Sequence, residues 1–505
     1  MSPESSNTLH NQNDLHPTNA LKRTAFLSTA TKAFFFPGKC TQKTEKSQFK
    51  ILLWFMIFAV VGMVLYARLW PDAPYTSPDT QHYLQAADDL RDFHISHLQH
   101  RPPGYPLVLI LTNSLESPGR LLFFAQMGMH FACIILLATQ FARMRIHIGL
   151  IGVFALLAFL PPWVAPTACV LSESTAEFFL VLGTTSLLAG LRSGERRWQV
   201  VAGTAFAFAA LTRPAYQFIS IAIIGTLVVL AIANPVFRRK WRTLVSSSIC
   251  LLLTAAFLIG SLVFYNHKNF GLAGLTPFLG GNLCTRTVRY YERLPDEYAE
   301  SREILIKHRD EALIKRGSDH NPMMSVWTAI PEIQHKLGLN TADLCNRLVK
   351  ANLVLIRKAP VNYLIEVGQS IVTYWFPRIG THASFGSRKV DVLWLLLHFL
   401  ILGVIFFYCI ILSGAICLAR CLSPRWWAMM GDDDNHSAEQ LAAIGITVTI
   451  IFYTMVISTT LETGNPRYRS PTDILILALL PLLISTWRQL RRTARQGVRD
   501  GDGAP

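Results

Sequence analysis

Charged residues are scarce in this sequence. Asp, Glu, Lys and Arg make up 16% of its 505 residues, whereas an ordinary soluble domain carries about 25%. Hydrophobic residues reach 51%, and the mean hydropathy is +0.32. This balance excludes an ordinary soluble globular protein and predicts an integral membrane protein.

Several familiar sequence patterns are also missing. None of the nine cysteines has Cys-X-X-Cys or Cys/His spacing, which argues against a structural zinc site. Glycine patterns of the Rossmann or P-loop kind are absent, so no soluble nucleotide-binding domain is expected. No internal repeat is evident, and many secondary transporters have one. The first 50 residues lack the apolar core and cleavage site of a secretory signal.

Long apolar runs dominate the chain instead. About ten of them are long enough, or nearly so, to cross a bilayer as a helix. The predicted fold class is therefore an all-α polytopic membrane protein with about ten transmembrane helices and a mainly helical external segment. The runs lie near residues 51–70, 119–142, 147–166, 171–191, 198–212, 215–234, 243–265, 391–419, 440–460 and 471–487.

Basic residues follow every second apolar run. Loops that stay on the cytoplasmic side of a membrane accumulate Lys and Arg, so this pattern predicts that both termini are cytoplasmic. The same pattern explains the net charge of +15 without nucleic acid, which we do not expect as a partner. The clusters include Arg143 and Arg145, Arg192 to Arg197, Arg238 to Arg242, Arg420 and Arg425, and Arg488 to Arg495.

This topology divides the chain into five parts. The short apolar stretch 363–376 contains Glu366 and Gln369, so we interpret it as an interfacial or re-entrant helix. If it crosses the membrane instead, one tail changes sides. The predicted parts are a disordered cytoplasmic tail (1–50), an N-terminal transmembrane module (51–265) with an external loop (71–118), an external segment with interfacial helices (266–390), C-terminal transmembrane helices (391–487) and a basic cytoplasmic tail (488–505).

Two features of the external regions stay open at this level. Cys284 and Cys345 both lie well inside the external segment, where a disulfide between them is one alternative to two free thiols. The first external loop contains His82, His94, His97 and His100. Such imidazoles either gather around a divalent metal or are solvated, and no metal ligand is assigned.

Two carboxylates are expected at the external surface. Asp79 follows Pro78 near the start of a short helix, where an aspartate can act as a helix cap. Glu173 lies at the outer end of an apolar run. A carboxylate at such a boundary is costly unless it is solvated, paired or used. Together Asp79 and Glu173 are the candidate catalytic residues.

Arginines are expected on the same external side, against the usual topological bias. Arg213 precedes Pro214 in a tight turn between two runs, and Arg467 and Arg469 precede the last run. The planar guanidinium group suits a phosphate, so an anionic ligand would explain these positions. Arg213 could alternatively be a snorkelling residue at the membrane interface.

These motifs together resemble GT-C membrane glycosyltransferases of the family-39-like group. That group includes dolichyl-phosphate-mannose protein mannosyltransferases and lipid A aminoarabinose transferases. The likeness covers most of residues 51–487. It rests on Asp79 with Tyr83, the turn Pro103-Gly104-Tyr105-Pro106, Glu173, Arg213-Pro214, the stretches Asn269-Phe270-Gly271 and Gly280-Gly281-Asn282-Leu283, and the element Arg467-Tyr468-Arg469-Ser470-Pro471.

The sequence departs from the best-studied members in two respects. Asp79 is followed by Thr80, so the adjacent acidic pair of the first loop is absent. The interval 265–390 does not resemble the carbohydrate-binding modules of eukaryotic protein mannosyltransferases. The identity of the acceptor therefore does not follow from the resemblance.

The resemblance implies transfer of a sugar from a polyprenyl-phosphate donor to a lipid, glycan or protein acceptor at the external or periplasmic face of a bacterial inner membrane. It implies Asp79 as general base, Glu173 as a group that orients the acceptor or a metal, and inversion at the anomeric carbon. No cofactor is required, although a divalent metal stays open. A lipid or lipid-linked-sugar transporter and a catalytically silent scaffold are the alternatives. The expected substrate-binding residues are Tyr83, Arg101, Tyr105, Arg213, Arg467, Tyr468 and Arg469.

Overall fold

The computed structural model describes residues 42–93, 100–316, 322–376 and 435–501, with a few further positions between 392 and 414. The chain divides into two compact units, Met1–Ile51 and Leu52–Pro505. The first described helix begins at Gln42, inside the tail that the sequence predicts to be disordered. The contacts below lie within the second unit.

The described residues form helices and contain no β-strand; Tyr75 and Cys169 form an isolated bridge. The first half of the chain contains α2 (Gln42–Leu69), α3 (Thr80–Arg91), α4 (Gly104–Leu111), α5 (Arg120–Arg143), α6 (Ile148–Ala158), α7 (Pro161–Val164), η2 (Ala165–Ala168), α8 (Glu173–Ser193), α9 (Arg196–Thr212), η3 (Pro214–Tyr216), α10 (Ile219–Ala233), α11 (Pro235–Arg239) and α12 (Trp241–Phe270). The second half contains α13 (Leu279–Thr287), η4 (Val288–Arg293), η5 (Asp296–Tyr298), α14 (Ala299–Arg316), η6 (Pro322–Met324), α15 (Ser325–Leu337), α16 (Thr341–Lys358), α17 (Pro360–Trp375), α21 (Asn435–Thr460), η8 (Pro466–Tyr468) and α22 (Ser470–Gly501).

Six of the described helices are long and apolar enough to cross a membrane. They involve α5, α8, α10, α12, α21 and α22. The protein is therefore a multi-pass integral membrane protein. The bent pair of Ile148–Ala158 and Pro161–Ala168 is a seventh candidate if it forms one span.

The remaining predicted spans have different outcomes. The run 147–166 forms the bent pair, whose halves meet at 65°, because Pro161 and Pro162 interrupt the helix. The described apolar part of the run 51–70 is the shorter helix Leu53–Leu69. The run 198–212 lies within α9, which has 17 residues. The run 391–419 falls almost entirely outside the described residues.

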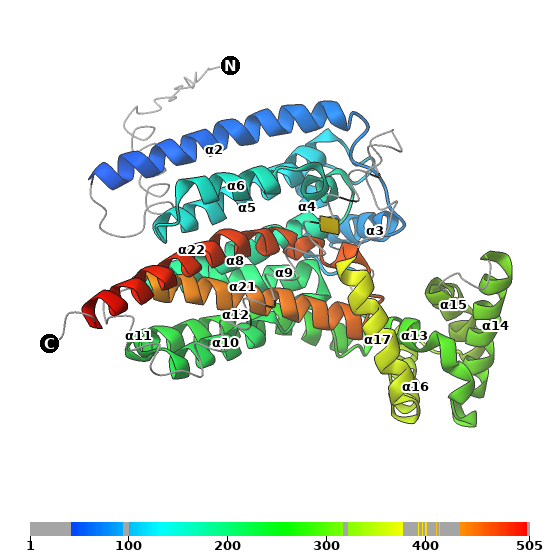
Figure 1. Ribbon diagram of the computed structural model, residues 1–505. Coiled ribbons are helices and arrows are strands. Elements are labelled where there is room, and N and C mark those ends of the chain that lie inside the picture. Colours follow the sequence, from blue (N-terminus) through cyan, green and yellow to red (C-terminus); the bar gives the residue numbers. More distant parts are fainter. Residues whose placement is uncertain are drawn as a thin grey trace, which may run out of the picture. The chain divides into compact units, whose positions relative to one another are not determined.

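The central packing involves α8 with α5, α9 and α22, and α9 with α12, which lie side by side (Figure 1). Small residues allow the close approaches, as expected where lipid supplies little driving force between helices. A Cβ added to Gly203 of α9 would lie 2.9 Å from the carbonyl oxygen of Cys250 in α12. One added to Gly183 of α8 would lie 2.8 Å from the ring of Phe206.

Polar contacts join the helix ends that the charge pattern assigns to the cytoplasm. Arg192 at the end of α8 pairs with Glu439 at the start of α21, with a nitrogen–oxygen distance of 2.9 Å. The Gln440 amide donates to the carbonyl oxygen of Met144, just beyond α5, at 3.1 Å. These ends therefore lie together. The start of α8 and the end of α21 are at the opposite end of their helices, towards the candidate site.

The segment 266–390, which the sequence predicts to be external, contains a second hydrophobic cluster, formed by residues of α13 to α16. Cys284 and Cys345 are free buried thiols, so the disulfide left open by the sequence is not formed. The predicted interfacial helix is α17, which is not among the span candidates of the described residues. Tyr363 of α17 donates to the carbonyl oxygen of Thr460 at 3.0 Å, which ties α17 to the end of α21.

Candidate functional site

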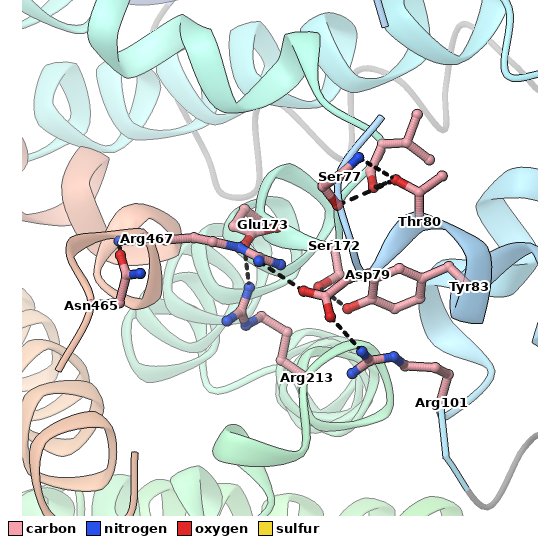
Figure 2. A network of polar contacts seen from close by, with 11 residues as sticks. Ser77, Asp79, Thr80, Tyr83, Arg101, Ser172, Glu173, Arg213, Asn465 and Arg467 are labelled. Carbon is pink, nitrogen blue, oxygen red and sulfur yellow. Dashed lines mark hydrogen bonds and ion pairs between the residues drawn. The ribbon is translucent and has the colours of Figure 1, made fainter. Parts of the chain in front are cut away.

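Five charged residues from five separate segments meet at one end of the helices (Figure 2). Asp79 directly precedes α3, and Glu173 is the first residue of α8. Arg101 precedes α4, Arg213 follows α9, and Arg467 lies in η8. We call this group the charged cluster. It contains both of the carboxylates and three of the four arginines that the sequence singled out.

Arg467 joins the two carboxylates. Its Nη1 lies 2.7 Å from Asp79 Oδ2, and its Nε lies 2.5 Å from Glu173 Oε1. Each carboxylate also has an arginine of its own. Arg101 Nη2 lies 2.8 Å from Asp79 Oδ1, and Arg213 Nη1 lies 2.8 Å from Glu173 Oε1. The result is a continuous chain of charges that links all five segments (Figure 2).

The position of Asp79 at the start of α3 does not make it a helix cap. Its backbone is helical and its side chain makes no capping hydrogen bond. The local turn is held by Thr80 instead, because the Ser77 amide donates to Thr80 Oγ1 at 2.8 Å. The Asp79 carboxylate is thus left for the arginines, and the capping alternative is wrong.

The turn before α4 brings Arg101 close to the end of α9. Gly104 packs directly against the backbone that precedes Arg213. A Cβ at Gly104 would lie 2.7 Å from the Thr212 nitrogen and 2.8 Å from the carbonyl carbon of Leu211. Only glycine permits this approach, and the rigid proline turn around it fixes the direction of the chain.

The loop that carries Arg467 is also closely packed. Gly464 has a φ of +63°, and a Cβ there would lie 2.5 Å from the carbonyl oxygen of Ser370 in α17. The Asn465 side chain accepts a hydrogen bond from the Arg467 amide at 2.9 Å. These contacts set the direction from which the Arg467 side chain reaches Asp79.

The two tyrosines of the first motifs have different surroundings. Tyr83 shares a hydrogen bond of 2.9 Å with Ser172 Oγ, and the Arg101 guanidinium lies 4.8 Å from the centre of its ring. Tyr105 is fully buried and donates to Gln126 Oε1 at 3.1 Å. Its ring contacts the Tyr83 ring edge to face. Tyr105 therefore packs against the Tyr83 ring from the protein interior and helps to hold it in place.

Tyr468 and Arg469, from the element before α22, also have different surroundings. Tyr468 lies beside the charged cluster, with its ring centre 5.6 Å from the Arg213 guanidinium. Arg469 is only 1% exposed, pairs with Asp473 at 2.7 Å and donates to the carbonyl oxygen of Trp375 at 3.2 Å. It attaches the start of α22 to the end of α17. The structure does not bring it into the charged cluster.

The charged cluster is mostly withdrawn from solvent. The side chain of Glu173 is 2% exposed, that of Arg213 13%, those of Arg101 and Arg467 19% and that of Asp79 32%. Burial raises the pKa of Asp79, but the positive charges of Arg101 and Arg467 outweigh this effect and hold the pKa below its usual value. Asp79 is therefore an anion in this arrangement.

Sequence reasoning missed one further acid, Glu462. It lies in the same loop as Arg467, is partly buried, and interacts electrostatically with Arg213, Arg467, Arg101 and Asp79. Burial raises the pKa of this carboxyl, and the nearby arginines only partly offset the effect. Its position in the element that ends in Arg467-Tyr468-Arg469 was the available signal.

Three buried polar atoms of the charged cluster have no hydrogen bond to any residue that the structure describes. These are Glu173 Oε2, Arg101 Nε and Arg213 Nη1, of which the last is held only by its ion pair with Glu173. Buried polar atoms are nearly always satisfied in folded proteins. A polar ligand at this position could supply the missing partners.

No group of three or more His, Cys, Asp or Glu side chains is arranged for a metal ion among the residues that the structure describes. His94 and His97 lie outside those residues. The carboxylates of the charged cluster face arginines, which would compete with a cation. The divalent metal that the sequence left open thus receives no assigned ligands.

Comparisons with models of protein families, with curated proteins and with solved structures find no match to this chain. What the protein does must therefore be argued from the charged cluster itself and from its position at the ends of membrane-spanning helices.

Proposed function

We propose that this protein is a GT-C type membrane glycosyltransferase. It would move a sugar from a polyprenyl-phosphate donor to a lipid, glycan or protein acceptor at the external face of the membrane, in bacteria the periplasmic face of the inner membrane. One observation carries the proposal. Three arginines and two carboxylates, drawn from motifs far apart in sequence, meet at the ends of apolar helices.

The balance of charge fits such a donor. Three arginines face two ionised carboxylates, so the five residues of the charged cluster have one net positive charge. The phosphodiester of a polyprenyl-phosphate sugar has one negative charge. Arginine offers paired donors that match phosphate oxygens. The surrounding apolar helices would accommodate the prenyl chain, which needs a lipid environment.

Binding of the donor would also prepare Asp79 for catalysis. In the structure, Arg101 and Arg467 hold Asp79 ionised, which makes it a weak base. A donor phosphate would compete for both guanidinium groups and weaken their contacts with Asp79. Loss of these charges raises the pKa of Asp79, so the carboxylate becomes a better acceptor for the proton of an acceptor hydroxyl.

The arginines would then stabilise the departing phosphate, on which negative charge grows as the bond to the sugar breaks. Attack by the acceptor from the face opposite the phosphate inverts the anomeric centre. Glu173 would hold Arg213 and Arg467 in place, since its carboxylate contacts both. Retention of configuration in the product would contradict this mechanism.

The main alternative is a transporter or flippase for a lipid-linked sugar. Polar groups inside the spans would favour it, and Glu177 of α8 does contact His130 of α5 at 2.8 Å. Both side chains are buried. Their pairing with each other gives a structural reason for their presence, whereas the charged cluster has atoms without partners.

The test uses purified protein in lipid vesicles with a panel of radiolabelled polyprenyl-phosphate sugars and candidate acceptors. We expect sugar transfer and release of polyprenyl phosphate by the wild type, and loss of transfer in Asp79→Asn. Asp296→Asn is the matched control, because Asp296 lies in η5 and its side chain is 95% exposed. Movement of the labelled lipid across the bilayer without transfer would favour the transporter.

A further inference from the structure

An aromatic residue of the segment 266–390 contacts the charged cluster. Phe278 directly precedes α13, and the guanidinium carbon of Arg101 lies 5.2 Å from the centre of its ring. The same carbon lies 4.8 Å from the centre of the Tyr83 ring. A cation within about 6 Å of an aromatic ring centre is attracted by the negative charge of the ring face. Two aromatic rings therefore hold Arg101 in addition to its ion pair with Asp79.

The loop that carries Phe278 is tied to the end of α12. Gly271 ends that helix with a φ of +68°, a conformation that glycine adopts without strain. The side-chain amide of Asn266, which is buried, donates to the carbonyl oxygen of Gly274 at 2.9 Å. The Phe278 carbonyl oxygen accepts a hydrogen bond from the Asn282 amide at 2.8 Å, in the first turn of α13. The backbone at Phe278 is thus fixed from both directions along the chain.

The glycine pair of α13 explains how the Phe278 ring is supported. A Cβ at Gly280 would lie 2.7 Å from the carbonyl oxygen of Cys345 in α16, and one at Gly281 would lie 3.0 Å from the Trp327 ring of α15. The Trp327 ring contacts the Phe278 ring edge to face, with ring centres 5.8 Å apart. Helices α15 and α16 therefore determine where the Phe278 ring lies.

Arg101 depends on this support because its polar contacts hold it on one side. Its Nη2 donates to Asp79 Oδ1 at 2.8 Å (Figure 2), whereas its Nε is buried without a hydrogen bond to any described residue. A long side chain loses rotational freedom when a ligand orders it, and this loss weakens binding. Aromatic rings that restrict the guanidinium group beforehand reduce the loss. Arg101 is thus ordered in advance of a ligand.

We propose that Phe278 is a positioning residue of the donor phosphate site and that it acts through Arg101. This inference rests on the proposed glycosyltransferase function, in which Arg101 binds the phosphate of the donor. The Phe278 ring keeps the guanidinium group beside Asp79, from where its hydrogen bonds can move to a phosphate oxygen. The segment 266–390 thereby completes the donor site, although none of the five residues of the charged cluster comes from it.

The test measures binding of radiolabelled polyprenyl phosphate to variants of Phe278 in lipid vesicles. Phe278→Leu and Phe278→Met keep an apolar side chain but remove the ring. We expect each to bind about 3- to 30-fold more weakly, the range that a cation–π contact can contribute. KM for the donor should rise by a similar factor and kcat should change less, because Arg101 is still present. Phe278→Tyr keeps the ring and should bind as the wild type does.

A second background shows whether Phe278 acts through Arg101. Arg101→Gln removes the cation, so Phe278→Leu should have no further effect on binding in that background. An effect of Phe278→Leu that depends on Arg101 is not expected from a purely structural role. Equal losses in the two backgrounds would overturn the proposal, because they would show that the ring acts on the ligand or on the fold directly.

A matched control and the transfer assay separate the remaining outcomes. Phe264→Leu on α12 replaces a phenylalanine that is 70% exposed and should retain wild-type binding. Wild-type binding by Phe278→Leu and Phe278→Met would also overturn the proposal, whatever the rate of transfer. A wild type that binds polyprenyl phosphate but transfers no sugar would instead contradict the proposed function.

Discussion

Arg467 lies 2.7 Å from Asp79 through Nη1 and reaches Glu173 through Nε. One guanidinium group therefore links the loop before α3 to the first turn of α8 and to the loop before α22. A planar group with several fixed donors can serve two carboxylates at once. The charged cluster therefore holds these three segments together. It is also a place where an anionic ligand could replace a carboxylate as the partner of the Arg467 guanidinium.

Removal of the Asp79 charge should abolish most transfer while preserving donor binding. Asp79→Asn keeps the size of the side chain but removes the proton acceptor, so we expect kcat to fall by about 10²- to 10⁴-fold. Steady-state kinetics with a polyprenyl-phosphate sugar measures the effect. Equal rates in the variant and the wild type would exclude Asp79 as the base.

Substitution of Arg467 by lysine should weaken catalysis although the charge is retained. Lysine has one ammonium group and cannot bridge Asp79 and Glu173 in the same geometry. Loss of one donor to a developing anion typically costs about 10²- to 10³-fold in kcat. Lys307→Arg on α14 is the reverse control, because its side chain is 53% exposed and should not affect transfer. A wild-type rate for Arg467→Lys would show that a positive charge at this position is sufficient for catalysis without the bridging guanidinium geometry.

A methyl group at Gly104 should disturb the junction between α4 and α9. The added Cβ of Gly104→Ala meets the backbone of Leu211 and Thr212 at under 3 Å, and backbone cannot rotate away. We expect a loss of about 1–3 kcal/mol in stability, as for other overpacked sites, measured as a lower thermal midpoint in detergent. Gly152→Ala on α6 has no neighbour within 4 Å of the added atom and should retain the wild-type midpoint.

Acid should weaken the contribution of Asp79 to folding. The pKa of Asp79 is held below its usual value, so its stabilising effect is present above the pKa of the unfolded chain. The effect is lost as pH falls through the folded pKa. The difference in thermal midpoint between wild type and Asp79→Asn should therefore shrink as the solution is acidified below about pH 4. A difference that is constant down to about pH 2 would contradict the ion-pair interpretation.

Labelling of single cysteines tests the predicted topology. In a background without the native cysteines, a cysteine at position 300 in α14 should react with a membrane-impermeant thiol reagent applied from outside. A cysteine at position 197, at the start of α9, should react only after the membrane is opened. Both positions are exposed in the structure. Reaction of both from one side would overturn the orientation inferred from the basic loops.

The sequence by itself determined the class of fold. Apolar runs of span length predict helices because a bilayer leaves backbone groups no partner except within a helix or a closed barrel. The runs that became α5, α8, α10, α12, α21 and α22 were identified to within a few residues. The bend at Pro161 was missed, because the run 147–166 was interpreted as one span although Pro161 and Pro162 interrupt it.

The same sequence located Asp79, Glu173, Arg213 and Arg467 at the ends of helices, since a charge in the middle of a span is costly. Which of these residues touch one another was decided only by tertiary structure. Tyr105 and Arg469 looked equivalent to Tyr83 and Arg467 in the motifs, yet each is buried and bonded to the scaffold. Glu462 was not singled out although it lies in the same loop as Arg467, because the burial that raises its pKa, and Arg101 and Arg213 that partly offset this effect, depend on tertiary structure. The burial of a side chain and its ion pairs depend on residues from other helices and loops. They therefore cannot be predicted from the local sequence around each residue.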